Sequence, residues 1–305
     1  MKQAGDIPKK FDSISALHRA LGFSRPLHPL VSLVNYADIK TPYAQLPKAL
    51  LLNFYKISYK RNLTDKVKYG QHYYDFDEGG LSFIAPNQVI SSAKEENDYS
   101  GYTLLFHVDF LSTYPLATRI KTFGFFSYAA NEALFLSDRE KQTIVSVFEN
   151  IQQELSNPID DFSQDVVISH IEVLLNYSNR FYKRQFLTRK SVNHDLLTRM
   201  EQLLTMYFDE EQTLEKGLPT VEYLADLLHV SPRYLSDMLR SLTGQNAQQH
   251  IHEKLIEKAK IFLTSTHLSV SEIAYQLGFE HSQSFNKLFK KKTNLTPIEF
   301  KQSFN

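Results

Sequence analysis

The hydrophobic pattern of the chain changes its period once, near residue 135. Before that point apolar residues alternate with other residues over short segments, which is typical of β-strands. The clearest case is 101–110, where one predicted face carries Tyr102, Leu104, Phe106, Val108 and Phe110. The opposite face carries Thr103, His107 and Asp109. Further strands are predicted over 48–59 and 81–85, the latter entered through the turn residues 77–80. Short strands separated by turns predict a small barrel or sandwich.

From about residue 137 the apolar residues recur with a helical period. Ser137 and Glu140 predict a capping box at the start of a helix, and Asn157-Pro158 predicts its end. A second helix follows, with an apolar stripe of Val167, Ile171, Leu174, Leu175, Ser178 and Tyr182. An apolar stripe does not identify what it packs on, so these helices could cover the β region or pack against a second copy.

We place a domain boundary near residues 185–195. An effector-binding or dimerisation domain is predicted over 1–187, with the β region to about 135 and helices over about 138–187. A helical domain follows over 194–305. The junction carries Arg180, Lys183, Arg184, Arg189 and Lys190 without an acidic residue. This basic segment is either a solvated helix end and linker or a phosphate contact.

The last 90 or so residues contain a near-repeat, 221–243 and 270–292. The offset is 49 residues at first, where Val221, Leu224, Ala225, Leu228 and Val230 match Val270, Ile273, Ala274, Leu277 and Phe279. It becomes 50 after the turn, where Leu235, Met238, Leu239 and Gly244 match Phe285, Leu288, Phe289 and Asn294. Each copy predicts a helix, a tight turn and a second helix, and such pairs place the second helix in the major groove of DNA.

Helix-end residues support this division. Ser231-Pro232 predicts the start of the second helix in the first copy, and Ser269 with Glu272 predicts a capping box in the second copy. Gly244 and Asn294 are predicted to end the second helices in left-handed caps, and Gly278 to close the helix before it.

The segment between the copies predicts a spacer helix from Ala247 to about Ser265, capped by Asn246. Such a helix is roughly 27 Å long. Successive major-groove faces of DNA are roughly 34 Å apart. A rigid spacer of this length would therefore let one chain contact two adjacent major-groove segments.

These residues resemble the DNA-binding domain of the AraC/XylS family of transcription regulators. The resemblance covers about 194–305 and rests on segments 221–225, 230–235, 273–279 and 284–290, together with Thr296-Pro297 ahead of Phe300. Gly80-Leu81-Ser82-Phe83-Ile84-Ala85-Pro86 resembles the cupin-type domain of many family members. The implied fold is α+β, with a cupin-like N-terminal β-barrel or sandwich, two following helices, and an all-α domain of two helix-turn-helix motifs.

The resemblance implies which side chains contact DNA. They are Arg233, Ser236, Asp237 and Arg240 in the first recognition helix, and Gln283, Ser284, Asn286 and Lys287 in the second, with Lys290 placed for phosphate. Arg and Lys donate to guanine, Gln and Asn pair with adenine, and an acid accepts from cytosine. Asp237 brings a negative charge toward a negative duplex, so the first helix is expected to contact less DNA than the second.

Charge is uneven within the helical region. Residues 194–230 hold 2 basic and 8 acidic residues, whereas 231–305 hold 10 and 6. The DNA face is therefore expected in the later part, with the acidic first helix turned away. The whole chain has a formal net charge of zero, which argues against a basic tail protein or an acidic disordered chain.

Chemistry for catalysis is not evident in the sequence. The chain has no Cys, which excludes a disulfide framework, a Cys-ligated metal, a cysteine nucleophile, and repair by methyl transfer to cysteine. No phosphate-binding glycine loop, G-x-S-x-G or H-E-x-x-H occurs. His107 and His72 are more easily explained as satisfied or exposed histidines than as metal ligands. We expect no catalytic residues, no metal and no cofactor; the abundant Tyr and Phe side chains line either an effector pocket or the core.

The sequence thus predicts a cytoplasmic, sequence-specific transcription regulator, an activator as the resemblance implies. Its expected partners are promoter DNA, a second copy in a homodimer and, for an activator, RNA polymerase. A small-molecule effector is left open, its site unknown, and no membrane contact is expected. The alternatives are a cupin-like enzyme, or a co-regulator that binds a protein, with a helical tail for assembly.

Overall fold

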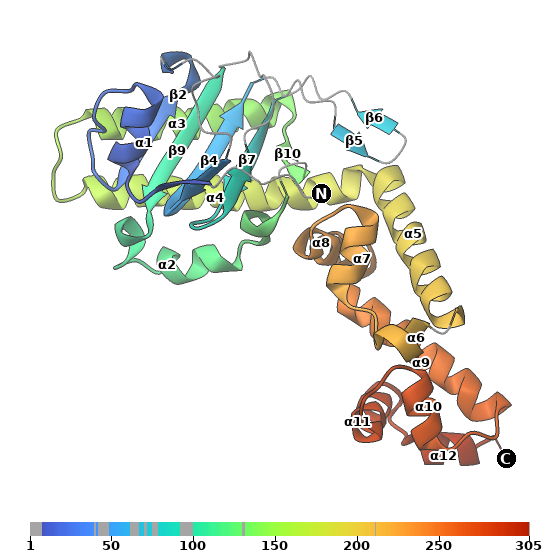
Figure 1. Cartoon of the computed structure of the whole chain (residues 1–305). Coiled ribbons are helices and arrows are strands. Elements are labelled where there is room, and N and C mark those ends of the chain that lie inside the picture. The colour runs from blue at the N-terminus through green and yellow to red at the C-terminus, as the bar shows by residue number, and fades with distance from the viewer. Residues whose placement is uncertain are drawn as a thin grey trace. The chain divides into compact units, whose positions relative to one another are not determined.

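The computed structural model describes residues 8–39, 41, 49–61, 67–69, 72–74, 79–91, 100–129, 132–210 and 212–304. The chain folds as two compact units, Met1–Gln185 and Phe186–Asn305 (Figure 1). The first unit mixes strands with helices, and the described part of the second is built from helices. The expected α+β architecture is therefore confirmed, with a β-rich N-terminal region followed by a helical C-terminal region.

The first unit is built around a five-stranded sheet of order β10-β7-β4-β9-β2. A three-stranded sheet, β1-β3-β8, and a hairpin of β5 and β6 complete its described strands. The elements are β1 (Lys9–Phe11), α1 (Ile14–Leu21), β2 (Val31–Asn35), β3 (Ala49–Leu52), β4 (Phe54–Lys60), β5 (Val67–Tyr69), β6 (His72–Tyr74), β7 (Gly80–Ile84), β8 (Val89–Ser91), β9 (Gly101–His107), α2 (Leu116–Arg119), β10 (Leu134–Phe135), α3 (Asp138–Ser156) and α4 (Ser163–Thr188).

The single strand predicted over 48–59 is wrong, because the chain changes sheets at Asn53. β3 pairs with β1 and β8, whereas β4 pairs with β7 and β9. The Asn53 N–H donates to the Phe11 carbonyl at 3.0 Å. Leu52 and Phe54 on either side are both fully buried, so the apolar pattern runs through the break without marking it.

The strand predicted over 101–110 is also too long. β9 ends at His107, and Val108–Leu111 form a short 3₁₀ turn, so Asp109 does not share a strand face with His107. The His107 ring nitrogen Nδ1 accepts from the Asp109 N–H at 3.3 Å. The Val108 side chain, expected on the apolar face, is instead exposed at the protein surface.

The second face of the central strands is buried as well. Thr103, expected opposite the apolar face, is only 5% exposed and lies beside Ser58 on β4, with 3.1 Å between the two hydroxyl oxygens. The Tyr36 hydroxyl donates to Ser58 Oγ at 2.9 Å. Burial of hydroxyls is tolerated here because each has a partner.

Ser58→Ala is therefore expected to destabilise the first unit. The substitution leaves the hydroxyls of Tyr36 and Thr103 short of a partner, which costs about 1–3 kcal/mol. Urea unfolding of the full chain measures the loss. Ser82→Ala is the control, since Ser82 pairs with Ser58 across β7 and β4 but is only half-buried; equal losses in the two variants would contradict the prediction.

The two helices after the sheet cover one of its faces, as Figure 1 shows for α3 and α4. The predicted capping box of Ser137 and Glu140 is present, and α3 ends at Ser156 before Asn157. The Phe148 ring lies 6.4 Å from the ring of Tyr59 and 5.8 Å from that of Tyr102, centre to centre. The ring of Tyr182 on α4 lies 6.1 Å from that of Phe83 on β7. Residues of both apolar stripes therefore pack on the sheet.

One cation of the basic segment has a structural role. Arg184 binds Glu140 through two contacts, Nε to Oε1 at 3.1 Å and Nη2 to Oε2 at 2.5 Å. Its Nη2 also donates to the Phe135 carbonyl at 2.8 Å. This arginine joins α4 to the start of α3, so it is not a free phosphate contact.

The second unit continues from the end of α4 through eight further helices in its described part. They are α5 (Lys190–Asp209), α6 (Gln212–Lys216), α7 (Val221–Leu228), α8 (Pro232–Thr243), α9 (Ala247–Ser265), α10 (Val270–Gln276), α11 (Ser282–Thr293) and α12 (Pro297–Gln302). None of the described helices is both long and apolar enough to span a bilayer.

The helix ends of the second unit confirm the predictions from the sequence. Ser231 caps α8, and Gly244 ends it with φ +80°. Ser269 and Glu272 form a capping box at α10, and Asn294 ends α11 with φ +63°. These ends depend on a capping side chain that accepts from a nearby backbone N–H, or on a residue that tolerates a left-handed backbone. Both features are local, so the sequence alone identifies them.

Candidate nucleic-acid interface

The second unit contains two helix pairs, α7–α8 and α10–α11, that follow the repeat of the sequence. In both pairs the repeated apolar residues form the core: Leu224, Ala225, Leu235, Met238 and Leu239 in the first, and Ile273, Ala274, Phe285 and Phe289 in the second, are all buried. The repeated alanines are fully buried, which allows the helices of each pair to approach closely. One face of α8 and one face of α11 therefore pack into the core.

The residues that the sequence assigned to DNA contact lie on the other face of these two helices. Ser236 and Asp237 are half-buried, and the rest are exposed: Arg233, Arg240, Gln283, Ser284, Asn286, Lys287 and Lys290. None of these nine side chains belongs to the buried core of the described residues. Both second helices therefore present polar side chains to solvent on the face away from the core.

On α8 three of these side chains form a cluster. The Arg233 Nε lies 2.9 Å from Oδ2 of Asp237, and the Arg240 Nη1 lies 3.3 Å from Oδ1 of the same carboxylate. The spacings of four and three residues place all three on one stripe of the helix. Base contact by Asp237 stays a prediction. These ion pairs were not predicted from the sequence, although a spacing of three or four residues between opposite charges indicates them.

On α11 the corresponding surface is basic. Within the described part of the chain no carboxylate forms an ion pair with Lys287 or Lys290. The helix continues with Lys291 and Lys292, both exposed. Burial lowers the pKa of His252 on α9, and the charges of Lys292 and Lys291 lower it further. The positive field of α11 therefore reaches the neighbouring helix.

The spacer helix α9 forms as predicted, from Ala247 to Ser265, with a capping box of Asn246 and Gln249. Its 19 residues correspond to about 28 Å. It contacts α8 of the first pair and α10 and α12 around the second. Ile251, Leu255 and Ala259 are buried along its length, so packing against neighbouring helices holds α9 in place within this unit.

A second connection joins the first half of this unit to α10. Thr213 on α6 donates through its hydroxyl to the Gln276 carbonyl at 2.6 Å. After α6 the backbone of Gly217 packs against Gly278, where an added Cβ would lie 2.8 Å from the Gly217 carbonyl carbon. The second helix pair is thus held from two sides, by α9 and by the segment after α6.

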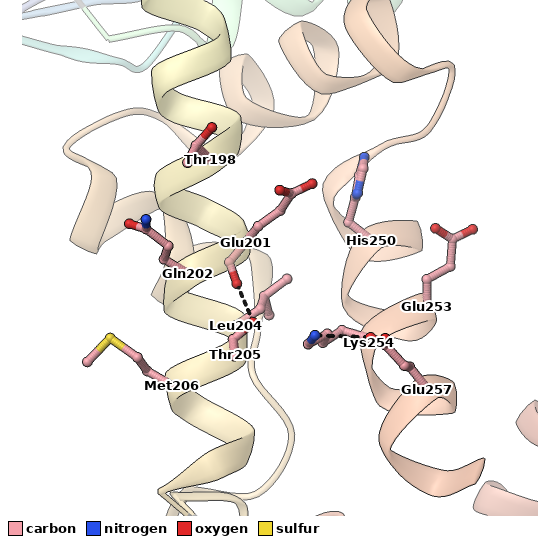
Figure 2. A pocket seen from close by; sticks show the side chains of 10 residues that line it. All are labelled: Thr198, Glu201, Gln202, Leu204, Thr205, Met206, His250, Glu253, Lys254 and Glu257. Carbon is pink, nitrogen blue, oxygen red and sulfur yellow. Dashed lines mark hydrogen bonds and ion pairs between the residues drawn. The ribbon is translucent and has the colours of Figure 1, made fainter. Parts of the chain in front are cut away.

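An open cleft of about 730 Å³ lies between α5 and α9 (Figure 2). Its lining includes three carboxylates, Glu201 on α5 with Glu253 and Glu257 on α9. Lys254 pairs with Glu257 at 3.0 Å, which leaves the lining with an acidic excess. A phosphate backbone would be repelled from this surface, consistent with the expectation that DNA contacts the later helices.

Among the residues that the structure describes, no three His, Asp or Glu side chains gather as metal ligands would. The His72 side chain lies outside the described positions.

Comparison with known proteins agrees with this geometry. Residues 224–303 match the family profile described as "Helix-turn-helix domain". The chain is 35% identical over 100 residues to the bifunctional transcriptional activator/DNA repair enzyme AdaA of Bacillus subtilis strain 168, covering 33% of this chain and 46% of that protein. It is 27% identical over 167 residues to the transcriptional activator RhaS of Citrobacter koseri, covering 54% of each.

A solved structure also matches this region. The C-terminal domain of the two-component response regulator yesN from Fusobacterium nucleatum is 34% identical, with a TM-score of 0.29, over 33% of this chain and 95% of that one. The matched part of the chain spans about half the length of AdaA and of RhaS.

The two helix pairs and their spacer define a double helix-turn-helix domain of the DNA-binding class. The region 224–303 is similar to the DNA-binding domains of AraC-type transcription regulators.

Proposed function

We propose that this chain is a sequence-specific DNA-binding transcription regulator, and an activator. The observation that carries the proposal is the pair of exposed polar helices, α8 and α11, joined by a packed spacer of about 28 Å. Two recognition helices on one rigid chain fit two adjacent major-groove segments. AdaA and RhaS are both transcriptional activators, which supports activation as the direction of control.

The same proposal assigns the remaining roles. Arg233, Ser236, Arg240, Gln283, Ser284, Asn286 and Lys287 face the bases, and Lys290 contacts phosphate. The N-terminal unit, about 1–187, serves dimerisation or effector binding, and an activator bound to its promoter contacts RNA polymerase. The protein acts in the cytoplasm and not as an enzyme. If a small-molecule effector acts, it must bind the DNA-competent state more tightly than the other state.

Selection of bound duplexes from a random library by the purified full chain tests the proposal. Enrichment of one motif with two half-sites about one helical turn apart is the expected result. Enrichment of no duplex would contradict the proposal.

Lys290→Ala is expected to weaken binding to the selected duplex and to an unrelated duplex by the same factor. Loss of one phosphate contact flattens the plot of log affinity against log salt by about 0.9. Fluorescence anisotropy over a salt series measures this. Lys254→Ala is the control, because it removes the same charge from the acidic cleft. A slope change of equal size in the control would refute the assignment of Lys290.

A further inference from the structure

The repeat gives the Arg–Asp–Arg cluster of α8 an internal comparison. At the offset of 50 residues, Arg233, Asp237 and Arg240 correspond to Gln283, Lys287 and Lys290 on α11. The outer positions are polar or basic in both copies, but the middle position carries a carboxylate in α8 and an ammonium group in α11. Two helices with the same fold therefore offer DNA opposite charges at the same place.

The carboxylate lies between two arginines that reach into solvent. The side chains of Arg233 and Arg240 are 49% and 52% exposed, whereas that of Asp237 is only 18% exposed. On a surface that faces DNA, the carboxylate weakens the attraction to phosphates. Asp237 therefore lowers the general attraction of α8 for DNA, while its two arginines stay accessible.

The contact atoms indicate what the carboxylate does. Asp237 accepts from Nε of Arg233, and among the residues that the structure describes neither Nη group of Arg233 has a hydrogen-bond partner, so both can donate in one plane. Two coplanar N–H donors are what bidentate contact with guanine O6 and N7 requires. Arg240 is held through Nη1, with Nη2 still available. An arginine already fixed in orientation loses less conformational entropy on binding.

We propose that Asp237 is a positioning residue that sets the sequence selectivity of α8: it orients Arg233 and Arg240 for guanine and suppresses their attachment to phosphates elsewhere. This inference rests on the proposed DNA-binding function. In the resulting division of roles, α11 supplies salt-sensitive affinity and α8 supplies discrimination between sequences.

The test compares Asp237→Asn with the unaltered full chain on the selected duplex and on a scrambled duplex of the same length. Freed arginines gain phosphate contacts, so the scrambled duplex should bind about tenfold more tightly near 50 mM salt, with a salt slope steeper by about one. The ratio of selected to scrambled affinity should fall about tenfold, the worth of one oriented guanine contact. Circular dichroism melting checks that the variant is folded.

Two further variants separate charge from position. Asp226→Asn removes the same charge from an exposed site on α7, and its selectivity ratio should stay at the wild-type value. Asp237→Glu restores the carboxylate and should restore the wild-type salt slope. The inference is overturned if Asp237→Asn behaves like Asp226→Asn, or if it raises both affinities by one common factor. Failure of the unaltered chain to enrich any duplex would instead overturn the proposed function, and this inference with it.

Discussion

Gly278→Ala is expected to lower the free energy of unfolding of the helical unit by about 3 kcal/mol, combining left-handed backbone strain with overpacking. Gly278 has φ +88°, a conformation that costs residues with a Cβ about 1–2 kcal/mol. The added Cβ would also lie 2.8 Å from the Gly217 carbonyl carbon and 3.0 Å from the Leu218 nitrogen. Both atoms belong to the backbone, so no side chain can rotate away and the segment after α6 must separate from α10.

Gly244→Ala is the matched control for this prediction. Gly244 has φ +80°, but a Cβ there would meet nothing within 4 Å, so only the backbone strain of about 1–2 kcal/mol remains. Hydrogen exchange of peptides from 212–304 in the full chain measures both losses in the same unit. Equal losses at the two glycines would show that crowding at Gly217 is unimportant.

The first copy of the repeat supports the same reasoning. His229 stands where Gly278 stands in the second copy and also has a positive φ, +58°. A histidine is accepted there at a modest energetic cost. The glycine of the second copy is therefore explained by the close approach of Gly217, in addition to its backbone angle.

The helical unit could be predicted closely because its boundaries depend on local chemistry. Ser231, Asn246 and Ser269 cap helices by bonding backbone N–H groups three residues ahead, so the sequence contains both partners. The repeat then fixed which helices pair. What the sequence could not provide is the contact of Gly217 with Gly278, which joins residues 61 positions apart.

The β-rich unit was predicted less well, for a related reason. Strand ends depend on partners that are distant in the sequence, and Asn53 is a single turn-forming residue between the apolar Leu52 and Phe54, too weak a signal to show that the chain changes sheets there. Alternation placed Thr103 on the face opposite the apolar one; that face is also buried, and Ser58 is the hydroxyl partner that makes the burial tolerable. Alternation assigns residues to faces, but it does not determine whether the second face is covered.

On α8 of the candidate site, the sequence predicted which residues lie away from the core but not which of them form ion pairs. Helical periodicity places the four predicted positions of α8 away from the core, and the structure leaves Arg233 and Arg240 exposed but Ser236 and Asp237 half-buried. The family resemblance implied a base contact for Asp237, and its ion pairs with Arg233 and Arg240 were not predicted. Spacing along the helix is the better guide to which charged side chains meet.

Phe289→Ala is expected to destabilise the helical unit by about 3–5 kcal/mol, the cost of removing a buried phenylalanine ring and leaving a cavity. The Phe289 side chain is fully buried. Its ring centre lies 5.7 Å from that of Phe285 on the same helix and 5.5 Å from that of Phe300 on α12. These rings hold α11 in place, so DNA affinity should fall together with stability.

Phe304→Ala is the control for this prediction. The ring centre of Phe304 lies 5.0 Å from that of Phe300, but the Phe304 side chain is 65% exposed. Exposed substitutions of this kind cost about 0.5 kcal/mol or less. Thermal unfolding and anisotropy titration of the same samples distinguish two kinds of loss. Lys290→Ala should weaken binding at unchanged melting temperature, whereas Phe289→Ala should lower both. If Phe289→Ala retained full affinity for the selected duplex, α11 would not require its packed face for contact with DNA.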